Sequence, residues 1–280
     1  YTYEDASPHA NIPFDRPEDS LRAGFDAIYG QYHIFHEFAK ASELIKYVES
    51  QLNMSYNVDK GKRLIGSFST HDDISPMYHG KTDYCNLTSG LQVTLPMLNP
   101  YIVDGFQSGD YYAYPYEEKE NLVKSQTDSD TMTVHHGQLD IFNLSRKPGG
   151  KNPEIGEFMT ECLKFKDKYA DIINKGSFIE LDKSGDKTDQ IIAYARHYQG
   201  RTLLVVANKN INRPISAKIK VPSLKENQEL KNLLPSYGGQ SKLQVEHNAL
   251  RVDLAPARIH VYEIDTPFIE NYTDKVYKQH

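Results

Sequence analysis

Residues 62–73 read KRLIGSFSTHDD, in which a strand candidate, residues 62–68, is followed at once by five polar residues. The run Lys62–Phe68 predicts a buried strand. In parallel α/β sheets and barrels, binding and catalytic side chains collect where the strands end. We therefore expect His71 and Asp72 at such an end, where a carboxylate can stabilise positive charge, transfer a proton or ligate a metal. The same residues also suit a turn that caps the next helix, with His71 merely packed.

Strand and helix patterns alternate on both sides of this stretch. Gly24–Tyr29 is a short apolar run, and apolar residues recur at helical spacing over residues 35–53. A second helical pattern covers residues 84–98, and a strand is predicted at Pro100–Val103. This order of strand, helix, strand, helix and strand predicts a parallel sheet. The preceding residues Tyr1–Asp19 are polar and are expected to form a loop.

The pattern changes after Gly176. The predicted helix Pro153–Asn174 has proline in its first turn and glycine just past its end. From there on, short runs of apolar residues separated by turn residues predict an antiparallel β module. The predicted strands are Ile191–Tyr198, Arg201–Ala207, Pro214–Val221, Leu243–Glu246, Ala249–Leu254 and Arg258–Ile264. We expect two domains, an α/β domain over residues 1–178 and an antiparallel sandwich over residues 179–280.

The composition excludes several classes of protein. Lys+Arg 32 minus Asp+Glu 38 leaves a net charge of −6, which argues against a general nucleic-acid binder. No apolar run approaches the roughly 18 residues of a membrane-spanning helix, so we expect no membrane insertion. Two cysteines, Cys85 and Cys162, are too few for a disulfide framework or a cysteine-rich metal site.

Other polar clusters are weaker signals. His135, His136 and Asp140 have side chains that ligate metals, but no spacing among them fixes a geometry, and a solvated loop is the simpler interpretation. They lie in the long, irregular, tyrosine-rich stretch 110–150, which is a candidate functional loop. The chain contains no phosphate-binding glycine loop, no GxSxG elbow and no HExxH motif.

The order of these elements resembles the C-terminal half of the α-amylase family, glycoside hydrolase family 13. Gly24–Tyr29 resembles the sixth barrel strand of the family, and residues 70–72, Thr-His-Asp, resemble its Asn-His-Asp motif after the seventh strand. Residues 95–105, LPMLNPYIVDG, resemble the Leu-Pro-Gly-x-Pro run that enters the eighth strand. Residues 155–181 resemble the last barrel helix and its connection to a C-terminal β-sandwich.

The resemblance implies both a fold and a function. The implied fold is α/β, the C-terminal part of a (β/α)8 TIM barrel (about strands 6–8) followed by an all-β antiparallel sandwich. The implied activity is that of a retaining glycoside hydrolase acting on an α-glucan or oligosaccharide. Asp72 would stabilise the transition state, and His71 would bind the hydroxyl groups of the substrate. Family members often bind calcium, so the resemblance leaves calcium open, and we predict no metal ligand in this chain.

The sequence departs from the family pattern in two ways. Some residues differ from the usual ones, which bears on the subfamily, and two catalytic groups of the family are not recognised in the chain. Thr70 replaces the usual Asn, Gln107 stands where many members have Glu, and Asn99 stands where Gly is usual. The family's nucleophile and general acid come from its fourth and fifth strands, and Glu4 is the one candidate for the acid within this chain. We therefore expect the chain alone to be inactive and to need a missing N-terminal half of the same protein. The alternatives are a transglycosidase of this family and a non-catalytic glycan-binding or interaction protein derived from the same fold.

Overall fold

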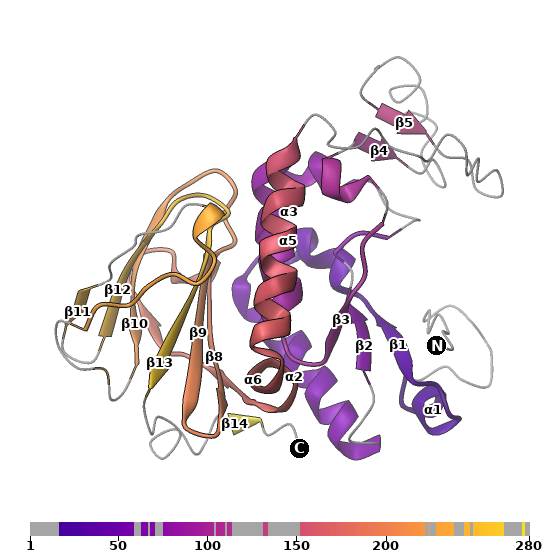
Figure 1. Ribbon diagram of the computed structural model, residues 1–280, viewed down its shortest axis with the longest axis horizontal. Coiled ribbons are helices and arrows are strands. Elements are labelled where there is room, and N and C mark those ends of the chain that lie inside the picture. Colours follow the sequence, from indigo (N-terminus) through magenta and orange to yellow (C-terminus); the bar gives the residue numbers. More distant parts are fainter. Residues whose placement is uncertain are drawn as a thin grey trace.

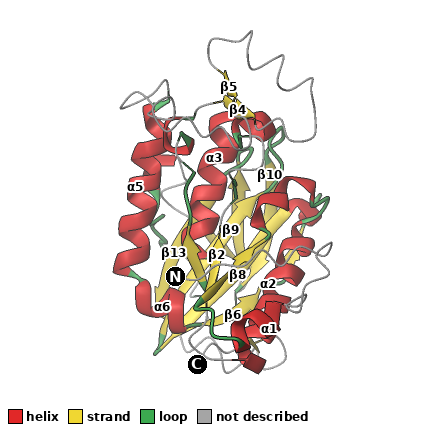
Figure 2. Ribbon diagram, turned by 90° about the vertical axis from the view of Figure 1, so that its right-hand side faces the viewer, coloured by secondary structure: helices red, strands yellow, loops and turns green. Residues whose placement is uncertain are grey.

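The protein forms three layers: a parallel sheet, a layer of helices, and a pair of antiparallel sheets (Figure 1). The computed structural model describes residues 17–58, 63–66, 68–70, 75–103, 105–109, 111–113, 131–133, 152–221, 224, 228–237, 244–246, 249–265 and 276–277. The helices lie between the parallel sheet and the antiparallel sheets (Figure 1), and Figure 2 shows the long helices side by side.

The parallel sheet confirms the predicted alternation of strands and helices. Its strands pair in parallel in the order β1-β2-β3. Helix α2 connects the first strand to the second, and helix α3 connects the second to the third. The bounds are β1 Ala27–Gly30, α2 Ala41–Val58, β2 Arg63–Gly66, α3 Met77–Thr94 and β3 Leu98–Pro100.

One face of this sheet is buried against the helices. Ile28, Leu64 and Leu98 are aligned across the three strands, and each is at most 2% exposed. The helices contribute apolar residues at the spacing of three and four that places them on one side of a helix. These core residues are Leu44, Ile45, Val48 and Leu52 of α2 and Leu87 and Leu91 of α3.

Several element boundaries differ from the sequence-based expectation. Instead of one helix over residues 35–53, a 3-10 helix, η1 (Tyr32–Glu37), ends at the extended residue Phe38 before α2 begins. Helix α3 begins before the predicted residue 84 and ends at Thr94, because Pro96 cannot continue a helix. The expectation of a loop up to residue 19 is wrong at its end, where Pro17 begins helix α1 (Pro17–Arg22).

The segment between the two parts of the chain is helical. Helix α5 (Pro153–Lys168) and helix α6 (Ala170–Lys175) replace the single predicted helix, and they meet at Tyr169. Within the long stretch 110–150, β4 (Tyr111–Ala113) and β5 (Thr131–Thr133) pair in parallel, and the rest of that stretch lies outside the described residues. None of the described helices has the length and apolar character needed to span a membrane.

The C-terminal part consists of two antiparallel sheets, with strand orders β13-β9-β8-β6-β14 and β11-β12-β10-β7. All six strands expected here are confirmed to within one residue at each end. Strands β6, β7 and β14 were not predicted, and residue 178, the expected domain boundary, falls inside β6. The bounds are β6 Ser177–Glu180, β7 Lys183–Ser184, β8 Ile191–Tyr198, β9 Arg201–Asn208, β10 Ile215–Lys220, β11 Gln244–Glu246, β12 Ala249–Leu254, β13 Ile259–Asp265 and β14 Val276–Tyr277.

The five-stranded sheet is buried on both faces. Ile191 and Ala193 of β8 share a core with residues of the other sheet, such as Ile219. Ile192 and Tyr194, which point to the opposite face, share the core of the helices and the parallel sheet. This explains why β8 and β9 read as nearly continuous apolar runs, whereas β10, with one exposed face, alternates strictly.

A buried arginine connects the end of helix α6 to strand β8 by hydrogen bonds. Arg196 is fully buried, and its Nη2 donates to the carbonyls of Ile173 at 2.7 Å and Gly176 at 2.8 Å. Its Nε donates to the Ser177 carbonyl at 3.3 Å. Carbonyls at a helix C-terminus lack donors within the helix and favour a positive charge. Burial lowers the pKa of Arg196 to about 9, so the guanidinium remains charged at neutral pH.

Both thiols of the chain should be unreactive in the folded protein. Cys85 on α3 and Cys162 on α5 are fully buried, and burial raises the pKa of each thiol, which removes the reactive thiolate. We expect Ellman's reagent to modify neither cysteine in native buffer and both in denaturant, as measured by absorbance. Rapid modification of one cysteine in native buffer would contradict the packing of α3 against α5.

Candidate functional site

The ends of β1, β2 and β3 meet at one side of the parallel sheet, which we call the carboxyl edge. The chain leaving β2 at this edge runs through Phe68, Ser69 and Thr70 into the predicted site residues His71 and Asp72. His71 and Asp72 themselves lie outside the described residues, and the description resumes at residue 75. The described part of the carboxyl edge near β2 consists of the residues that flank the predicted pair.

The residues before His71 are held firmly. The Phe68 ring packs against the rings of Tyr32 and Phe35, each with a centroid separation of 5.4 Å. Ser69 and Thr70 are 3% and 6% exposed. The chain is therefore fixed by packing as far as the residue before His71.

Two neutral phenols support the end of β1. The Tyr47 hydroxyl on α2 accepts a hydrogen bond from the Gln31 amide at 2.8 Å, directly after β1. The Tyr47 ring meets the Tyr32 ring edge-on, with centroids 5.0 Å apart. Burial raises the pKa of Tyr47 to about 12 and raises the pKa of Tyr32 further above its ordinary value. Both side chains are uncharged at neutral pH; Tyr47 acts here through packing and its hydrogen bond to Gln31, and Tyr32 acts through packing.

The residues after Asp72 lead into a strained helix start. The buried Ser75 Oγ accepts a hydrogen bond from the Met77 amide at 3.2 Å. Lys81 then adopts φ 55° and ψ −150°, a backbone conformation that is nearly restricted to glycine and costs about 1–3 kcal/mol. This kink separates the first turn of α3 from the rest of the helix. Strained residues of this kind cluster at binding and active sites.

Two tyrosines stand together at the carboxyl edge. Tyr29, near the end of β1, and Tyr101, just after β3, meet edge-on with ring centroids 5.9 Å apart. The Tyr29 hydroxyl donates to the Ser69 carbonyl at 3.5 Å, and the ring of His33 lies 6.3 Å from that of Tyr29. Tyr101 is 37% exposed. The edge thus carries aromatic surface beside the segment that enters the His71–Asp72 pair.

The exit from β3 is fixed by two glutamines. Gln92, a buried residue of α3, donates from Nε2 to the Tyr101 carbonyl at 3.1 Å. Gln107 accepts a hydrogen bond at Oε1 from the Gly105 amide at 3.1 Å. Gly105 has φ +94°, which suits glycine. Gln107, which stands where many relatives in the resembled family have Glu, therefore supports a turn through its amide oxygen.

The turn before β3 has its left-handed residue at Met97. Met97 has φ +63°, a conformation that costs a residue with a side chain about 1–2 kcal/mol. It is the third residue of the Leu-Pro-Gly-like run, where glycine would carry no such cost. Asn99, which stands where Gly is usual in the resembled family, is a strand residue paired with Ile65, so the left-handed conformation that favours glycine lies at Met97 and not at Asn99.

The remaining predicted candidates are not part of the described site. Glu4, His135, His136 and Asp140 lie outside the described residues. Among the residues that are described, no group of three or more His, Cys, Asp or Glu side chains could hold a metal ion.

Tyr29 and Tyr101 were not predicted as site residues. The available signal was their place at the ends of two strands of one parallel sheet.

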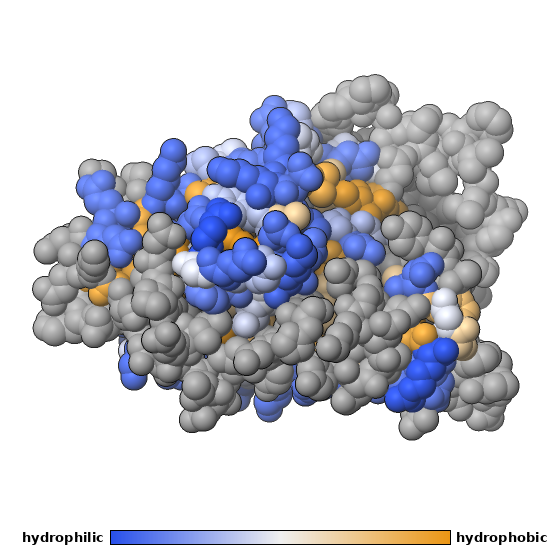
Figure 3. Space-filling view, turned by 60° about the horizontal axis from the view of Figure 1, so that its bottom comes forward, coloured by the Kyte–Doolittle hydropathy of each residue, from blue (hydrophilic) through white to orange (hydrophobic). Residues whose placement is uncertain are grey.

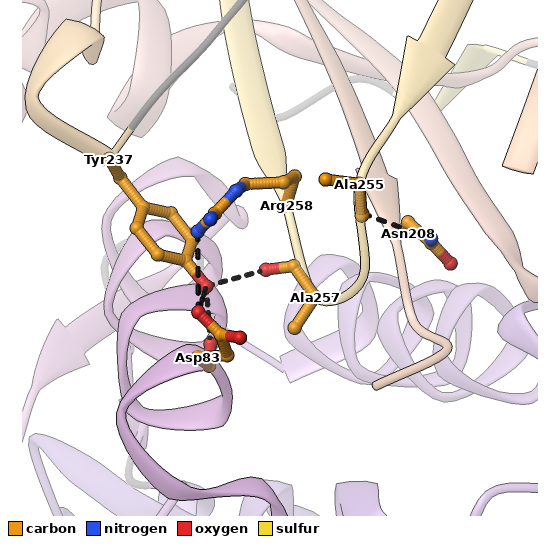
Figure 4. Close-up of polar contacts among 6 residues, drawn as sticks. All are labelled: Asp83, Asn208, Tyr237, Ala255, Ala257 and Arg258. Atoms are coloured by element: carbon orange, nitrogen blue, oxygen red, sulfur yellow. Dashed lines mark hydrogen bonds and ion pairs between the residues drawn. The ribbon is translucent and has the colours of Figure 1, made fainter. Parts of the chain in front are cut away.

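Hydrogen bonds and an ion pair connect helix α3 to residues beside the antiparallel sheets (Figure 4). The Tyr237 hydroxyl lies 2.8 Å from the Asp83 carbonyl and 3.1 Å from the Ala257 carbonyl. Arg258 stacks on the Tyr237 ring at 4.1 Å and reaches Asp83 Oδ1 at 3.3 Å. Burial raises the pKa of Tyr237, which keeps the phenol a hydrogen-bond donor.

Close packing continues along the same helix. The Thr94 hydroxyl is 2.6 Å from the Tyr194 hydroxyl of β8. A Cβ placed on Gly90 would lie 2.7 Å from Ile259 Cγ2 of β13. Helix α3, which follows the His71–Asp72 segment in the chain, therefore packs directly against the five-stranded antiparallel sheet.

Solved structures with a similar fold include several α-amylases and a debranching enzyme. No protein-family model matches the sequence, and no curated protein sequence matches it. The maltogenic α-amylase AmyB of Thermotoga neapolitana is 16% identical, with a TM-score of 0.60, over 87% of this chain and 51% of that one. An Anoxybacillus α-amylase gives 12% identity and a TM-score of 0.63 over 91% and 51%. The acarbose complex of the Geobacillus thermoleovorans α-amylase gives 13% and 0.61 over 90% and 52%.

The chain spans about half the length of each of these proteins while being almost wholly covered itself. At these identities the likeness establishes the fold. It agrees with the resemblance to the α-amylase family that the sequence shows at residues 24–29, 70–72 and 95–105. The chain therefore has the fold of the C-terminal part of the α-amylases of glycoside hydrolase family 13.

Proposed function

We propose that the chain is part of an α-glucan-active, retaining glycoside hydrolase of the α-amylase type. In this proposal β1, β2 and β3 are strands six to eight of a (β/α)8 barrel, residues 1–178 belong to that barrel, and residues 179–280 form the C-terminal β-sandwich. One observation carries the proposal: a fold match over about nine-tenths of the chain to enzymes of this type. The parallel order β1-β2-β3, with α2 and α3 as connections, supports the placement within the barrel.

Asp72 and His71 have distinct roles in this proposal. Cleavage of a glucosidic bond passes through a state with positive charge on the sugar ring, and the Asp72 carboxylate stabilises that charge. His71 donates or accepts hydrogen bonds at sugar hydroxyls, and such bonds strengthen as the ring distorts. Both residues follow β2 in the chain, directly after Ser69 and Thr70, and side chains that follow the strands of such sheets commonly bind substrate, which supports these assignments.

The two further carboxyl groups of a retaining mechanism come from outside this chain. A retaining glycosidase needs a nucleophile and a general acid about 5–5.5 Å apart. The proposal assigns both to an N-terminal half of the same protein, on the strands that would precede β1 in a complete barrel. It assigns no metal ligand to this chain.

The proposed substrate is an α-linked gluco-oligosaccharide. Among the similar structures, AmyP was solved with maltose and, as a variant, with maltotriose, and the Geobacillus enzyme was solved with acarbose. The shared fold supports a substrate of the same class here.

The test compares this chain with the protein that includes the N-terminal half. We expect only the longer protein to hydrolyse maltotriose, with a product of retained anomeric configuration in ¹H NMR. Binding without hydrolysis by the longer protein would overturn the proposal and favour the glycan-binding alternative. Hydrolysis by the 280-residue chain alone would contradict the assignment of the nucleophile and the general acid to the N-terminal half.

A further inference from the structure

Two histidine rings are stacked between the chain after β1 and the start of α3. His36 in η1 and His79 in the first turn of α3 have ring centroids 3.8 Å apart, and their planes are inclined by 14°. These segments follow β1 and β2, two neighbouring strands of the parallel sheet. The stack therefore joins the two segments through side chains that can each take up a proton.

The neutral form of His36 has a defined tautomer. Its Nδ1 lies 2.9 Å from the His33 carbonyl, and a carbonyl only accepts hydrogen bonds, so Nδ1 carries the hydrogen. The other nitrogen, Nε2, is therefore the atom that takes up a proton. It lies 3.7 Å from Glu37 Oε1, so a single added charge on this ring has a carboxylate nearby.

Further titratable side chains belong to the elements packed around the pair. The Tyr84 ring of α3 lies 5.5 Å from the His79 ring, and burial raises the pKa of this phenol, which keeps it uncharged. Lys209, from the connection after β9, lies over an aromatic ring of η1; burial lowers its pKa, and Glu43 of α2 raises it. Asp83 of α3 forms the ion pair described above. Both signs of charge are thus nearby, whereas a charge on each histidine would place two like charges in direct contact.

The first turn of α3 is connected to the rest of the helix through non-helical backbone. Gly80 and Lys81 interrupt the helix directly after His79. Side-chain contacts therefore decide where the turn lies. Met77 places it in a small apolar core with Phe106 of η2, and His79 connects it to η1. Loss of the stack would release the turn from η1 without removing its contact to that core.

Protons from the solvent can reach the pair. The described residues on the face in Figure 3 are mostly hydrophilic, with hydrophobic residues in small areas. The His36 side chain is 31% exposed, and His79 is partly exposed. A change of pH therefore acts on this contact in the folded protein and does not require unfolding.

We propose that the His36–His79 stack is a pH-sensitive contact that holds the first turn of α3 against η1 at neutral pH and opens in acid. Neutral imidazole rings stack through their flat faces, whereas two protonated rings repel each other at this distance. Histidine changes its charge between about pH 5 and pH 8. The open state binds more protons than the closed one, so the stabilisation by the stack is present at neutral pH and is lost as the pH falls.

The contact lies close in the chain to the predicted site residues. The first turn of α3 follows His71 and Asp72, so opening of the stack would loosen the end of that segment. The inference itself does not depend on the proposed function, because this chain forms the contact alone and no substrate is involved.

The test is hydrogen–deuterium exchange of the 280-residue chain at about pH 7.5 and about pH 5, on peptides that cover residues 75–84. Exchange is expressed relative to the intrinsic rate at each pH. We expect protection of these residues to fall about fivefold or more in acid, while β8 and β9 stay protected. His36→Phe and His79→Phe each keep two aromatic rings but allow at most one charge on the pair. Both variants should keep their protection in acid within about twofold of the neutral value.

The matched control is His197→Phe on β8, which removes a histidine outside the pair whose pKa is lowered by burial. This variant should lose protection of residues 75–84 in acid, as the unsubstituted chain does. Circular dichroism at about pH 7.5 establishes that each variant is folded. NMR of the histidine ring protons gives a second measurement that needs no variant. The stacked rings should show ring-current shifts at neutral pH and lose them in acid.

Four outcomes would overturn the proposal. These are equal protection of residues 75–84 at both pH values, an acid loss that persists in both phenylalanine variants of the pair, an acid loss that His197→Phe also abolishes, and absence of ring-current shifts at neutral pH.

Discussion

Asp72→Asn is expected to lower kcat for maltotriose hydrolysis about 10³-fold in the protein that includes the N-terminal half. The substitution keeps the size of the side chain and removes its charge. The charge acts on the positively charged transition state far more than on the neutral substrate, so kcat should fall while KM changes little. Loss of one fixed electrostatic group of this kind costs about 3–4 kcal/mol, and each 1.36 kcal/mol is a factor of ten in rate. Initial rates of reducing-end release measure the effect.

The neighbouring carboxylate provides a matched control for this experiment. Asp73→Asn removes the same charge one residue further along and is expected to change kcat less than about fivefold. The difference between the two variants separates a specific role of Asp72 from a general loss of negative charge. Full activity in Asp72→Asn, or equal losses in both variants, would contradict the role assigned to Asp72.

Arg196→Met is expected to lower the free energy of unfolding by about 3–5 kcal/mol. Methionine fills much of the volume of the arginine stem but donates no hydrogen bond. The carbonyls of Ile173, Gly176 and Ser177 would then lose the donor that they share inside the protein. A buried acceptor left without its donor costs about 1–3 kcal/mol, and here several carbonyls lose one shared donor at once. Urea unfolding followed by circular dichroism, with the slope m compared between proteins, measures the change.

Arg201, on the adjacent strand β9, provides the control for this prediction. Arg201 forms an ion pair with Glu263 at 2.6 Å, but its side chain is 48% exposed. Exposed ion pairs contribute less than about 1 kcal/mol, so Arg201→Met should shift the unfolding free energy by no more than that. A loss in Arg196→Met as small as the loss in Arg201→Met would show that the buried guanidinium does not hold α6 to β8.

The sequence predicts those parts of the fold that depend on local pattern. Strands β8, β9 and β12 agree with the expectation almost residue for residue, because apolar runs bounded by turn residues specify them locally. The alternation that leads to the parallel sheet is equally readable. Strand β7, with two residues, is too short to leave a pattern, and the break between η1 and α2 interrupts a continuous helical spacing.

The site is harder to predict from the sequence, because its residues come together only through the pairing of strands across the sheet. His71 and Asp72 can be proposed from a motif, but the meeting of Tyr29 with Tyr101 depends on the register of β1 and β3 on either side of β2. Arg196 meets its carbonyl partners only after α6 has packed beside β8. Likewise, the residue type of Met97 does not mark it as left-handed, because methionine rarely adopts the positive φ that it has here.

The contact between Gly90 and Ile259 has a consequence for exchanging parts between relatives. Because a methyl group at position 90 would lie 2.7 Å from Ile259 Cγ2, a larger residue at position 90 requires a smaller residue at position 259 or a shift of its side chain. A chimaera that joins these helices to the antiparallel sheets of another enzyme would bring together two surfaces that did not co-evolve. Such grafts should succeed only when helix α3 and strand β13 are inherited from the same parent.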